Sequence, residues 1–304
     1  MASDRRAIVV TGATGKQGGA LIEALLAKPS QPFNIYAVTR NKESNSAKSL
    51  ASKPNVHVVE WHFDDPAAIF AQVEKPWGLF SVTTPELGKK NAAVIEEQQG
   101  KAMNTAAMAA GVQHVVYTSV DRGVDENTET PVPHFRSKKH VEDDLKTQAA
   151  SKGAVWTILR TVAFMDNMTN DFMGRVFVAM WRQVGMDTPL QLLSSKDIGR
   201  VVAEIFLHAE DDEYRNKAIS LAGDSITARQ AEQAFTDATG QEMPAAFGIF
   251  GSLAKAMMSD ELGTMFRWFK EVGFAADVAG LKKKYPFLKD FKSWVETESA
   301  WRKS

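Results

Sequence analysis

Cysteine is absent from the chain of 304 residues. Its absence excludes disulfide bonds, thiolate catalysis and cysteine-ligated zinc, and it suits a reducing compartment. The sequence also lacks an apolar run of the roughly 18 residues that a membrane helix needs, and no apolar leader follows the charged start "MASDRRAIVV". We therefore expect a cytoplasmic protein, with entry into the nucleus as an alternative.

An excess of charge of either sign is lacking as well. Lysine and arginine number 36 against 37 aspartate and glutamate residues, which gives a formal net charge of -1 and a pI of about 6.6. No global field draws such a protein onto nucleic acid or an anionic membrane. We expect neither of these as a partner, and expect a small neutral or anionic ligand instead.

What the sequence does contain is a regular alternation of short apolar runs and helix-length amphipathic segments. The predicted strands are Ala7–Val10, Asn34–Thr39, Val56–Trp61, Gly78–Val82, His114–Ser119 and Val155–Leu159, and the predicted helices include Gly18–Leu26, Pro66–Val73, Val94–Ala110 and His134–Ala150. Strand, helix and strand at this spacing predict right-handed crossovers. The fold class is therefore α/β, with a doubly wound parallel sheet of the Rossmann type.

The character of the sequence changes after Gly223, where the pattern becomes mainly helical. We predict a dinucleotide-binding domain over residues 1–222 and a smaller, mainly helical substrate-side domain over residues 223–304. Residues 161–189 are expected to contribute to the cleft and to the smaller domain. Methionine and aromatic residues of these parts form either a core or the wall of a cleft for an apolar metabolite: Phe164, Met165, Met168, Phe172, Met173, Phe247, Phe250, Met257, Met258, Met265, Phe266, Trp268 and Phe269.

A glycine-rich turn follows the first predicted strand in "VVTGATGKQGGALIEALL". Gly12, Gly15 and Gly18 are spaced as G-x-x-G-x-x-G and open a helix. Such glycines provide a tight turn, close approach of the backbone to a pyrophosphate, and close packing of helix on strand. In a strand–turn–helix context the motif predicts a dinucleotide site, with phosphate at the helix N-terminus.

The residues at the end of the second predicted strand indicate whether NAD or NADP is bound. NAD sites carry an acidic residue there, whereas this chain has "YAVTRNKES" with Arg40. One charge-assisted bond from Arg40 to a 2′-phosphate, worth about 2 kcal/mol, would favour NADP over NAD by about 30-fold. A solvated loop arginine is the alternative interpretation.

Other predicted strands end in polar or aromatic residues at the same edge of the sheet. Thr83, Thr84 and Pro85 follow the fourth strand, and His62 and Phe63 follow the third. Ligands of open α/β sheets bind at the carboxyl ends of the strands. Phe63 either stacks on adenine or belongs to the core. No metal site is expected, because the histidines lack further ligands at suitable spacing.

These motifs, with "VTRN" after the second strand, "HF-x-SK-x-x-VE" after the fifth, and the later "DNM" and "DIG", resemble the NmrA-like family of atypical short-chain dehydrogenase/reductases. The resemblance extends from Ala7 to about Ala222. It implies NADP(H) as cofactor, and contacts to it from Thr11, Gly12, Ala13, Thr14, Gly15, Lys16, Gln17, Gly18, Arg40, Asn41, Lys42, Glu43, Ser44, His62, Phe63, Thr83, Thr84, Pro85, Lys138, Ala163, Phe164, Met165 and Asp166.

The segment "PVPHFRSKKHVEDDL" occupies the place where classical short-chain reductases carry Y-x-x-x-K. Lys138 matches the lysine, but His134 stands where the tyrosine should be, and an imidazolium beside an ammonium is disfavoured. Candidate catalytic groups are therefore Lys138, His134 and Ser119, of which the last could bind a carbonyl oxygen. Alternatively, His134 is satisfied by backbone groups near the helix start. The run Glu142-Asp143-Asp144 is interpreted as a solvated face.

A second Y-x-x-x-K match, Tyr285 to Lys289, lies far beyond the predicted sheet, and we expect Tyr285 to pack in a core. Two functions stay open. The first is an NADPH-dependent reductase of a carbonyl, imine or enone in an apolar metabolite. The second is a non-catalytic NADP(H) redox sensor that regulates a partner protein. The missing tyrosine favours the sensor, the intact lysine favours the enzyme, and the apolar C-terminal part allows a homodimer.

Overall fold

The computed structural model describes residues 5–61, 65–84, 91–125, 129–246 and 260–302. By its contacts the chain divides into two compact units, each assembled from separate stretches of sequence. The first unit comprises Met1–Ser119, Ser137–Arg160 and Ile198–Ile219, and the second comprises Val120–Arg136, Thr161–Asp197 and Ser220–Ser304. The domain boundary that we predict after residue 222 stays a prediction.

The first unit is built on a seven-stranded sheet with the order β3-β2-β1-β4-β5-β6-β9. The strands are β1 (Arg6–Val10), β2 (Phe33–Thr39), β3 (Val56–Glu60), β4 (Pro76–Val82), β5 (His114–Val120), β6 (Val155–Thr161) and β9 (Lys217–Leu221). The pairs β1–β2, β2–β3, β1–β4 and β4–β5 are parallel. The chain winds from β1 outward to β3 and returns beside β1 as β4, which makes the carboxyl ends of β1 and β4 a topological switch point. The predicted doubly wound sheet is confirmed.

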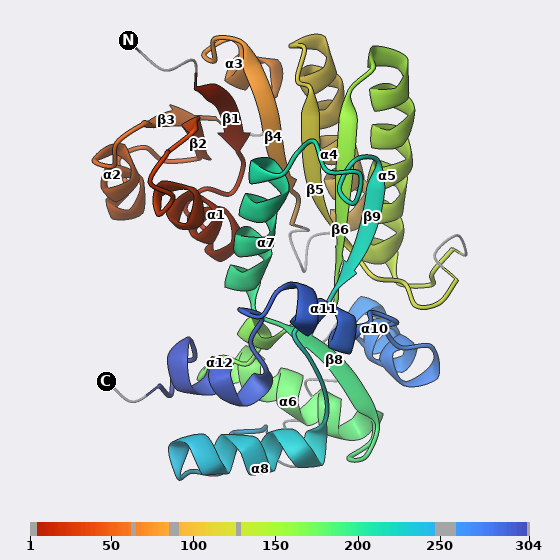
Figure 1. Ribbon diagram of the computed structural model, residues 1–304. Helices are drawn as coiled ribbons and strands as arrows, with labels where there is room; N and C mark the ends of the chain where they lie inside the picture. Colours follow the sequence, from red (N-terminus) through yellow and green to blue (C-terminus); the bar gives the residue numbers. More distant parts are fainter. Residues whose placement is uncertain (1–4, 62–64, 85–90, 126–128, 247–259, 303–304) are drawn as a thin grey trace. The chain divides into compact units, whose positions relative to one another are not determined.

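Helices cover both faces of this sheet (Figure 1). They are α1 (Lys16–Leu26), α2 (Asn45–Ala51), α3 (Ala67–Phe70), α4 (Ala92–Ala109), α5 (Pro133–Lys152) and α7 (Ser195–Leu207). Alternate strand residues point to opposite faces. Val9 and Leu79 belong to the core cluster that includes α4 and α5, whereas Gly78 faces Phe206 of α7. α7 also packs closely on α1, since a Cβ on Gly199 would lie 2.3 Å from the carbonyl oxygen of Gln17.

The second unit is mainly helical, as predicted, but it also contains a three-stranded sheet with the order β10-β8-β7 that the sequence pattern did not indicate. Its elements are β7 (Ala163–Phe164), the 3-10 helix η1 (Met165–Asn167), α6 (Phe172–Val184), β8 (Pro189–Leu193), β10 (Asp224–Thr227), α8 (Ala228–Thr239), α10 (Asp260–Glu271), α11 (Val278–Lys284) and α12 (Phe291–Thr297). β8 pairs antiparallel with β10 and parallel with β7.

Five of the thirteen methionine and aromatic residues predicted to form a core or a cleft wall are buried in the core of the second unit, and Met265 packs against that core: the five are Met165, Met168, Phe266, Trp268 and Phe269. Phe172 and Met173, at the start of α6, are both 55% exposed. Phe247, Phe250, Met257 and Met258 lie outside the described residues. Within the described ranges, no helix combines the length and the apolar character needed to span a membrane.

Candidate functional site

The glycine-rich turn between β1 and α1 has a backbone that only glycine accommodates at two positions. Gly12 has a φ of +60°, and a Cβ there would lie 2.9 Å from Cγ1 of Val82. A Cβ on Gly18 would lie 2.5 Å from the carbonyl oxygen of Gly12. Gly15 caps α1 without a side-chain hydrogen bond, and the first turn of α1 has no acidic residue. The amide groups and the dipole of this helix end therefore favour an anion.

Thr11 fixes the turn to the neighbouring strand. Its Oγ1 donates to the carbonyl oxygen of Phe80 at 3.0 Å and accepts from the amide of Val82 at 2.9 Å. The amide of Ala13 donates to the carbonyl oxygen of Val38 at 3.4 Å, on the other side of β1. Because both contacts use groups within the sheet, the turn is held at the switch point between β1 and β4.

A cavity of about 350 Å³ opens at this point, within the size range of small-molecule sites. It lies at the carboxyl ends of β1, β2, β3 and β4 and against α4. Its lining residues are Thr11, Gly12, Thr14, Gly15, Val38, Thr39, Arg40, Trp61, Ser81, Val82, Thr83, Thr84, Gln99 and Met103. The prediction from the sequence therefore placed the turn, Arg40 and the two threonines at one cavity, and missed the wall that Trp61, Gln99 and Met103 provide.

Arg40 contributes the positive charge of the lining, and none of the described lining residues is acidic. The rest of the predicted segment, from Asn41 to Ser44, does not line the cavity. Oδ1 of Asn41 accepts from the amide of Glu43 at 2.9 Å, and the Ser44 side chain caps α2. Lys42 approaches Glu60 at 3.8 Å. These residues shape the turn that presents Arg40, and their predicted contacts with a cofactor stay predictions.

Lys138 lies directly behind the lining. Its Nζ donates to Oε1 of Glu96 at 2.7 Å, and to both the carbonyl oxygen and Oγ1 of Thr83 at 3.1 Å. An ammonium group has three protons, so these three acceptors match its donors. Lys138 itself does not line the cavity, and it reaches the cavity through Thr83.

Glu96 is a functional candidate that sequence reasoning missed. Its side chain is fully buried, and its second oxygen accepts from Oγ of Ser137 at 2.7 Å. Oγ1 of Thr83 is also 3.2 Å from the hydroxyl of Tyr117. The position of Glu96 in the helix could have indicated this role. Glu96 lies on the same face of α4 as Gly100 and other buried residues, and an acidic side chain on a buried face needs a partner.

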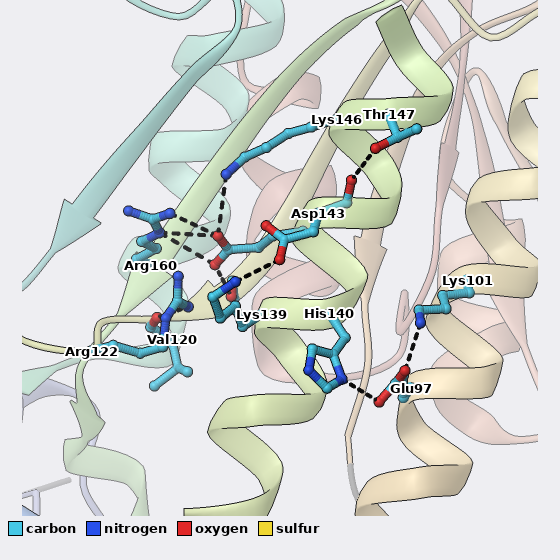
Figure 2. Close-up of polar contacts among 12 residues, drawn as sticks. Glu97, Lys101, Val120, Arg122, Lys139, His140, Asp143, Lys146, Thr147 and Arg160 are labelled. Carbon is cyan, nitrogen blue, oxygen red and sulfur yellow. Dashed lines mark hydrogen bonds and ion pairs between the residues drawn. The ribbon is translucent and has the colours of Figure 1, made fainter. Parts of the chain in front are cut away.

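Ser119 is part of a separate buried cluster and does not line the cavity. Its hydroxyl donates to Oε1 of Glu142. Arg160 contacts the carboxylate of Glu142 through Nη2 at 2.8 Å, and Nζ of Lys146 lies 3.8 Å from it. Figure 2 labels both cations. The interpretation of Glu142 as part of a solvated face was wrong, because its side chain is fully buried. Only Asp143 of the acidic run is exposed.

Lys16 and Gln17, in the first turn of α1, do not line the cavity. His134 and residues 163–166 belong to the second unit, and three further predicted residues lie outside the described ranges. His134, at the start of α5, is half-buried and its ring lies edge-on to Phe135, with centroids 4.7 Å apart. Ala163, Phe164 and Met165 form β7 and the start of η1, and Oδ2 of Asp166 accepts from the amide of Ser195 at 2.8 Å. His62, Phe63 and Pro85 lie outside the described residues.

Tyr285, in the second Y-x-x-x-K match, is buried as expected for a packing residue. Lys289 lies 3.0 Å from Glu298, so its charge is matched within the second unit. Among the described residues, no group of three or more histidine, aspartate or glutamate side chains has the geometry to hold a metal ion.

The sequence profile of the NmrA-like family matches residues 4–295. The chain belongs to the NmrA-like family. The NmrA-like family domain-containing oxidoreductase lnbB of Aspergillus flavus is 27% identical over 258 residues, which cover 77% of this chain and 74% of that protein. Quinone oxidoreductase 2 of Escherichia coli is 25% identical over 78% of this chain and 76% of its own.

Solved structures show the same fold. The crystal structure of NmrA, a negative transcriptional regulator, superposes with a TM-score of 0.73 at 18% identity, and covers 97% of this chain and 96% of its own. The NADPH-dependent quinone oxidoreductase QOR2 from Escherichia coli, in complex with NADPH, gives a TM-score of 0.69 at 22% identity, with 95% of this chain and 98% of that chain covered. Solved structures with this fold thus include a quinone oxidoreductase and a negative transcriptional regulator.

Proposed function

We propose that this protein is an NADP(H)-dependent oxidoreductase that reduces a carbonyl, imine or enone group of a small apolar metabolite. The observation that carries the proposal is the cavity in which the glycine turn and Arg40 meet. The turn offers backbone amides at a helix N-terminus to a diphosphate. Arg40 offers a guanidinium to a 2′-phosphate, and the described part of the lining brings no acidic side chain beside it.

The residues present fit an NADP(H) dinucleotide. Gly12 and Gly18 leave the space that a Cβ would fill, so the backbone can approach a diphosphate closely. Oε1 of Gln17 is buried beside this turn, and no group in the described part of the chain forms a hydrogen bond with it. When bound, NADPH supplies a hydride. The NADPH complex of the relative QOR2 supports the same choice of cofactor.

In this proposal Lys138, His134 and Ser119 remain the candidates for steering the proton. Lys138 is nearest to the cavity, because Thr83 is both its hydrogen-bond partner and a lining residue. The hydroxyl of Ser119 is engaged by Glu142. Of the three, Lys138 is therefore the group that the arrangement of the first unit supports best.

A second function, a non-catalytic NADP(H) sensor that regulates a partner protein or changes its own association state, is favoured by two observations. Histidine replaces the tyrosine of the catalytic motif at position 134. The ammonium of Lys138 has its three donors matched by Thr83 and Glu96. The likeness to NmrA, a negative transcriptional regulator, agrees with this alternative.

Purified protein mixed with NADPH and a panel of aromatic ketones, imines, enones and quinones separates the two functions. The reductase predicts loss of reduced cofactor that depends on both the protein and one class of acceptor. Tight NADPH binding without consumption of the cofactor by any acceptor would replace the reductase with the sensor.

A matched pair of variants tests the glycine turn itself. Gly18→Ala places a methyl group 2.5 Å from the carbonyl oxygen of Gly12, whereas Gly19→Ala meets no atom closer than 3.6 Å. We expect Gly18→Ala to lower NADPH affinity at least about tenfold, because the displaced turn no longer matches a diphosphate. Gly19→Ala should bind NADPH as the wild type does. Equal affinities of the two variants, measured by titration calorimetry, would contradict the placement of the diphosphate.

A further inference from the structure

A buried ion pair behind the cavity wall joins Lys138 to Glu96, a residue that has no role in the function described above. The side chain of Glu96 is 0% exposed and that of Lys138 is 13% exposed, and their charged atoms are 2.7 Å apart. Taking two charges out of water is costly, and an ion pair offsets that cost only when further hydrogen bonds satisfy both groups. Here Ser137 and Thr83 provide those bonds to the carboxylate, at 2.7 Å and 2.9 Å.

Thr83 connects this ion pair to the cavity. The ammonium of Lys138 bonds to both the carbonyl oxygen and the hydroxyl oxygen of Thr83, so it fixes the backbone and the side chain of one residue. The hydroxyl of Thr83 in turn donates to Glu96. A residue held at three points cannot shift without breaking bonds to a charged partner.

We propose that Glu96 is a positioning residue, which anchors the ammonium of Lys138 and through it fixes Thr83 at the edge of the dinucleotide cavity. The inference rests on the proposed function, because it takes NADPH as the ligand of that cavity. Glu96 touches neither the cavity nor the cofactor in this account. It acts by fixing the lining before the ligand binds, which lowers the cost of ordering on binding.

The test measures the Kd of NADPH by titration calorimetry for the wild type, Glu96→Gln, Lys138→Met and the double variant. Glu96→Gln keeps the shape of the side chain but removes the charge that holds Lys138. We expect it to raise the Kd about tenfold, in keeping with the loss of charge-assisted hydrogen bonds. In the Lys138→Met background the same substitution should change the Kd by less than about twofold, because its effect passes through Lys138.

Glu97→Gln is the matched control, one residue along α4. The carboxylate of Glu97 bonds to Lys101 and His140, at 2.6 Å and 2.8 Å (Figure 2). None of these three residues lines the cavity. The Kd of the Glu97→Gln variant for NADPH should lie within about twofold of the wild-type value. Should Glu96→Gln fail to fold, Ser137→Ala removes the bond to the second carboxylate oxygen of Glu96 and should raise the Kd about threefold.

Unchanged affinity in Glu96→Gln, or in Ser137→Ala where the former does not fold, overturns the inference. The inference is also overturned if Glu96→Gln changes the Kd equally in the wild type and in the Lys138→Met background, since a merely structural role would give that result. Wild-type protein that produces no heat with NADPH overturns the proposed function together with the inference. Binding by the wild type with unchanged variants overturns the inference alone.

Discussion

Two glutamates of the first unit, Glu96 and Glu142, have fully buried side chains but different surroundings. Glu96 pairs with Lys138, which also holds Thr83 in the lining of the cavity. Glu142 pairs with Arg160, and neither residue lines that cavity. Burial and pairing alone therefore do not indicate a functional site, because every buried carboxylate needs a partner. The connection to the cavity distinguishes the two.

The two glutamates also have different cationic partners, arginine for Glu142 and lysine for Glu96. Arg160 donates from Nε to both oxygens of Glu142, at 3.3 Å and 3.2 Å, and from Nη2 to Oε2 at 2.8 Å, so its planar guanidinium faces the whole carboxylate. Lys138 donates one bond to Glu96 and directs its others to Thr83. The arginine locks a carboxylate in place, whereas the lysine links a carboxylate to a third residue.

Arg160→Met should have the largest effect on stability, and it tests whether the Glu142 pair differs from the Glu96 pair. This change removes the closely bound guanidinium from the buried Glu142 carboxylate, and the ammonium of Lys146 lies at 3.8 Å. We expect a loss of about 3 to 5 kcal/mol in the free energy of unfolding, measured by urea denaturation. NADPH affinity of the remaining folded protein should stay within about twofold of the wild type.

Lys146→Met is the control for Arg160→Met, because its ammonium is farther away and its side chain is 34% exposed. Its loss of stability should be below about 1 kcal/mol. A drop in NADPH affinity in Arg160→Met comparable to that in Glu96→Gln would break the comparison, since it would couple the Glu142 cluster to the cavity as well.

His114 is a third buried titratable residue of the first unit, and it is held neutral instead of being paired with an acid. Burial, with a smaller contribution from the charge of Arg215, lowers the pKa of His114 from 6.5 to about 4. The hydroxyl of Thr157 donates to the carbonyl oxygen of Tyr214 at 2.7 Å, so its oxygen accepts from Nε2 of His114 at 2.8 Å. The neutral ring with its proton on Nε2 satisfies this chain of bonds.

The next largest effect is therefore a loss of stability in acid. The unfolded chain protonates His114 near pH 6.5, whereas the folded protein resists protonation down to about pH 4. Above pH 6.5 the neutral His114 ring costs the folded protein no stability. As the pH falls below 6.5 the free energy of unfolding declines, and at about pH 4 it is lower by about 3 kcal/mol. His114→Gln keeps a donor but does not titrate, so the wild type should lose that much more stability than the variant between neutral pH and pH 4. If the free energy of unfolding of the wild type and of His114→Gln falls in parallel with decreasing pH, His114 is not held neutral.

The architecture of the sheet could be predicted from the sequence because its strands are short apolar runs separated by helix-length segments. The predicted Asn34–Thr39 corresponds to β2 (Phe33–Thr39), and the predicted Val56–Trp61 corresponds to β3 (Val56–Glu60). The glycine turn was predictable as well, since its spacing reflects a local backbone requirement.

Contacts between residues far apart in sequence could not be predicted in the same way. Lys138 was found from its place on α5, but its partner Glu96 lies on another helix, and an acidic residue on a helix is ordinarily solvated. The interpretation of Glu142 failed for the same reason, because Arg160 lies on β6. The sheet of the second unit was missed because β7 has only 2 residues and β10 only 4, too few for a periodic pattern.

The most direct test of the central claim is titration calorimetry of the wild type and Arg40→Gln with NADPH and with NADH. A guanidinium that lines the cavity beside the glycine turn should favour NADPH by about 30-fold, or about 2 kcal/mol, and Arg40→Gln should abolish most of that preference. No heat with either dinucleotide, or a preference of the wild type for NADH, would contradict the account.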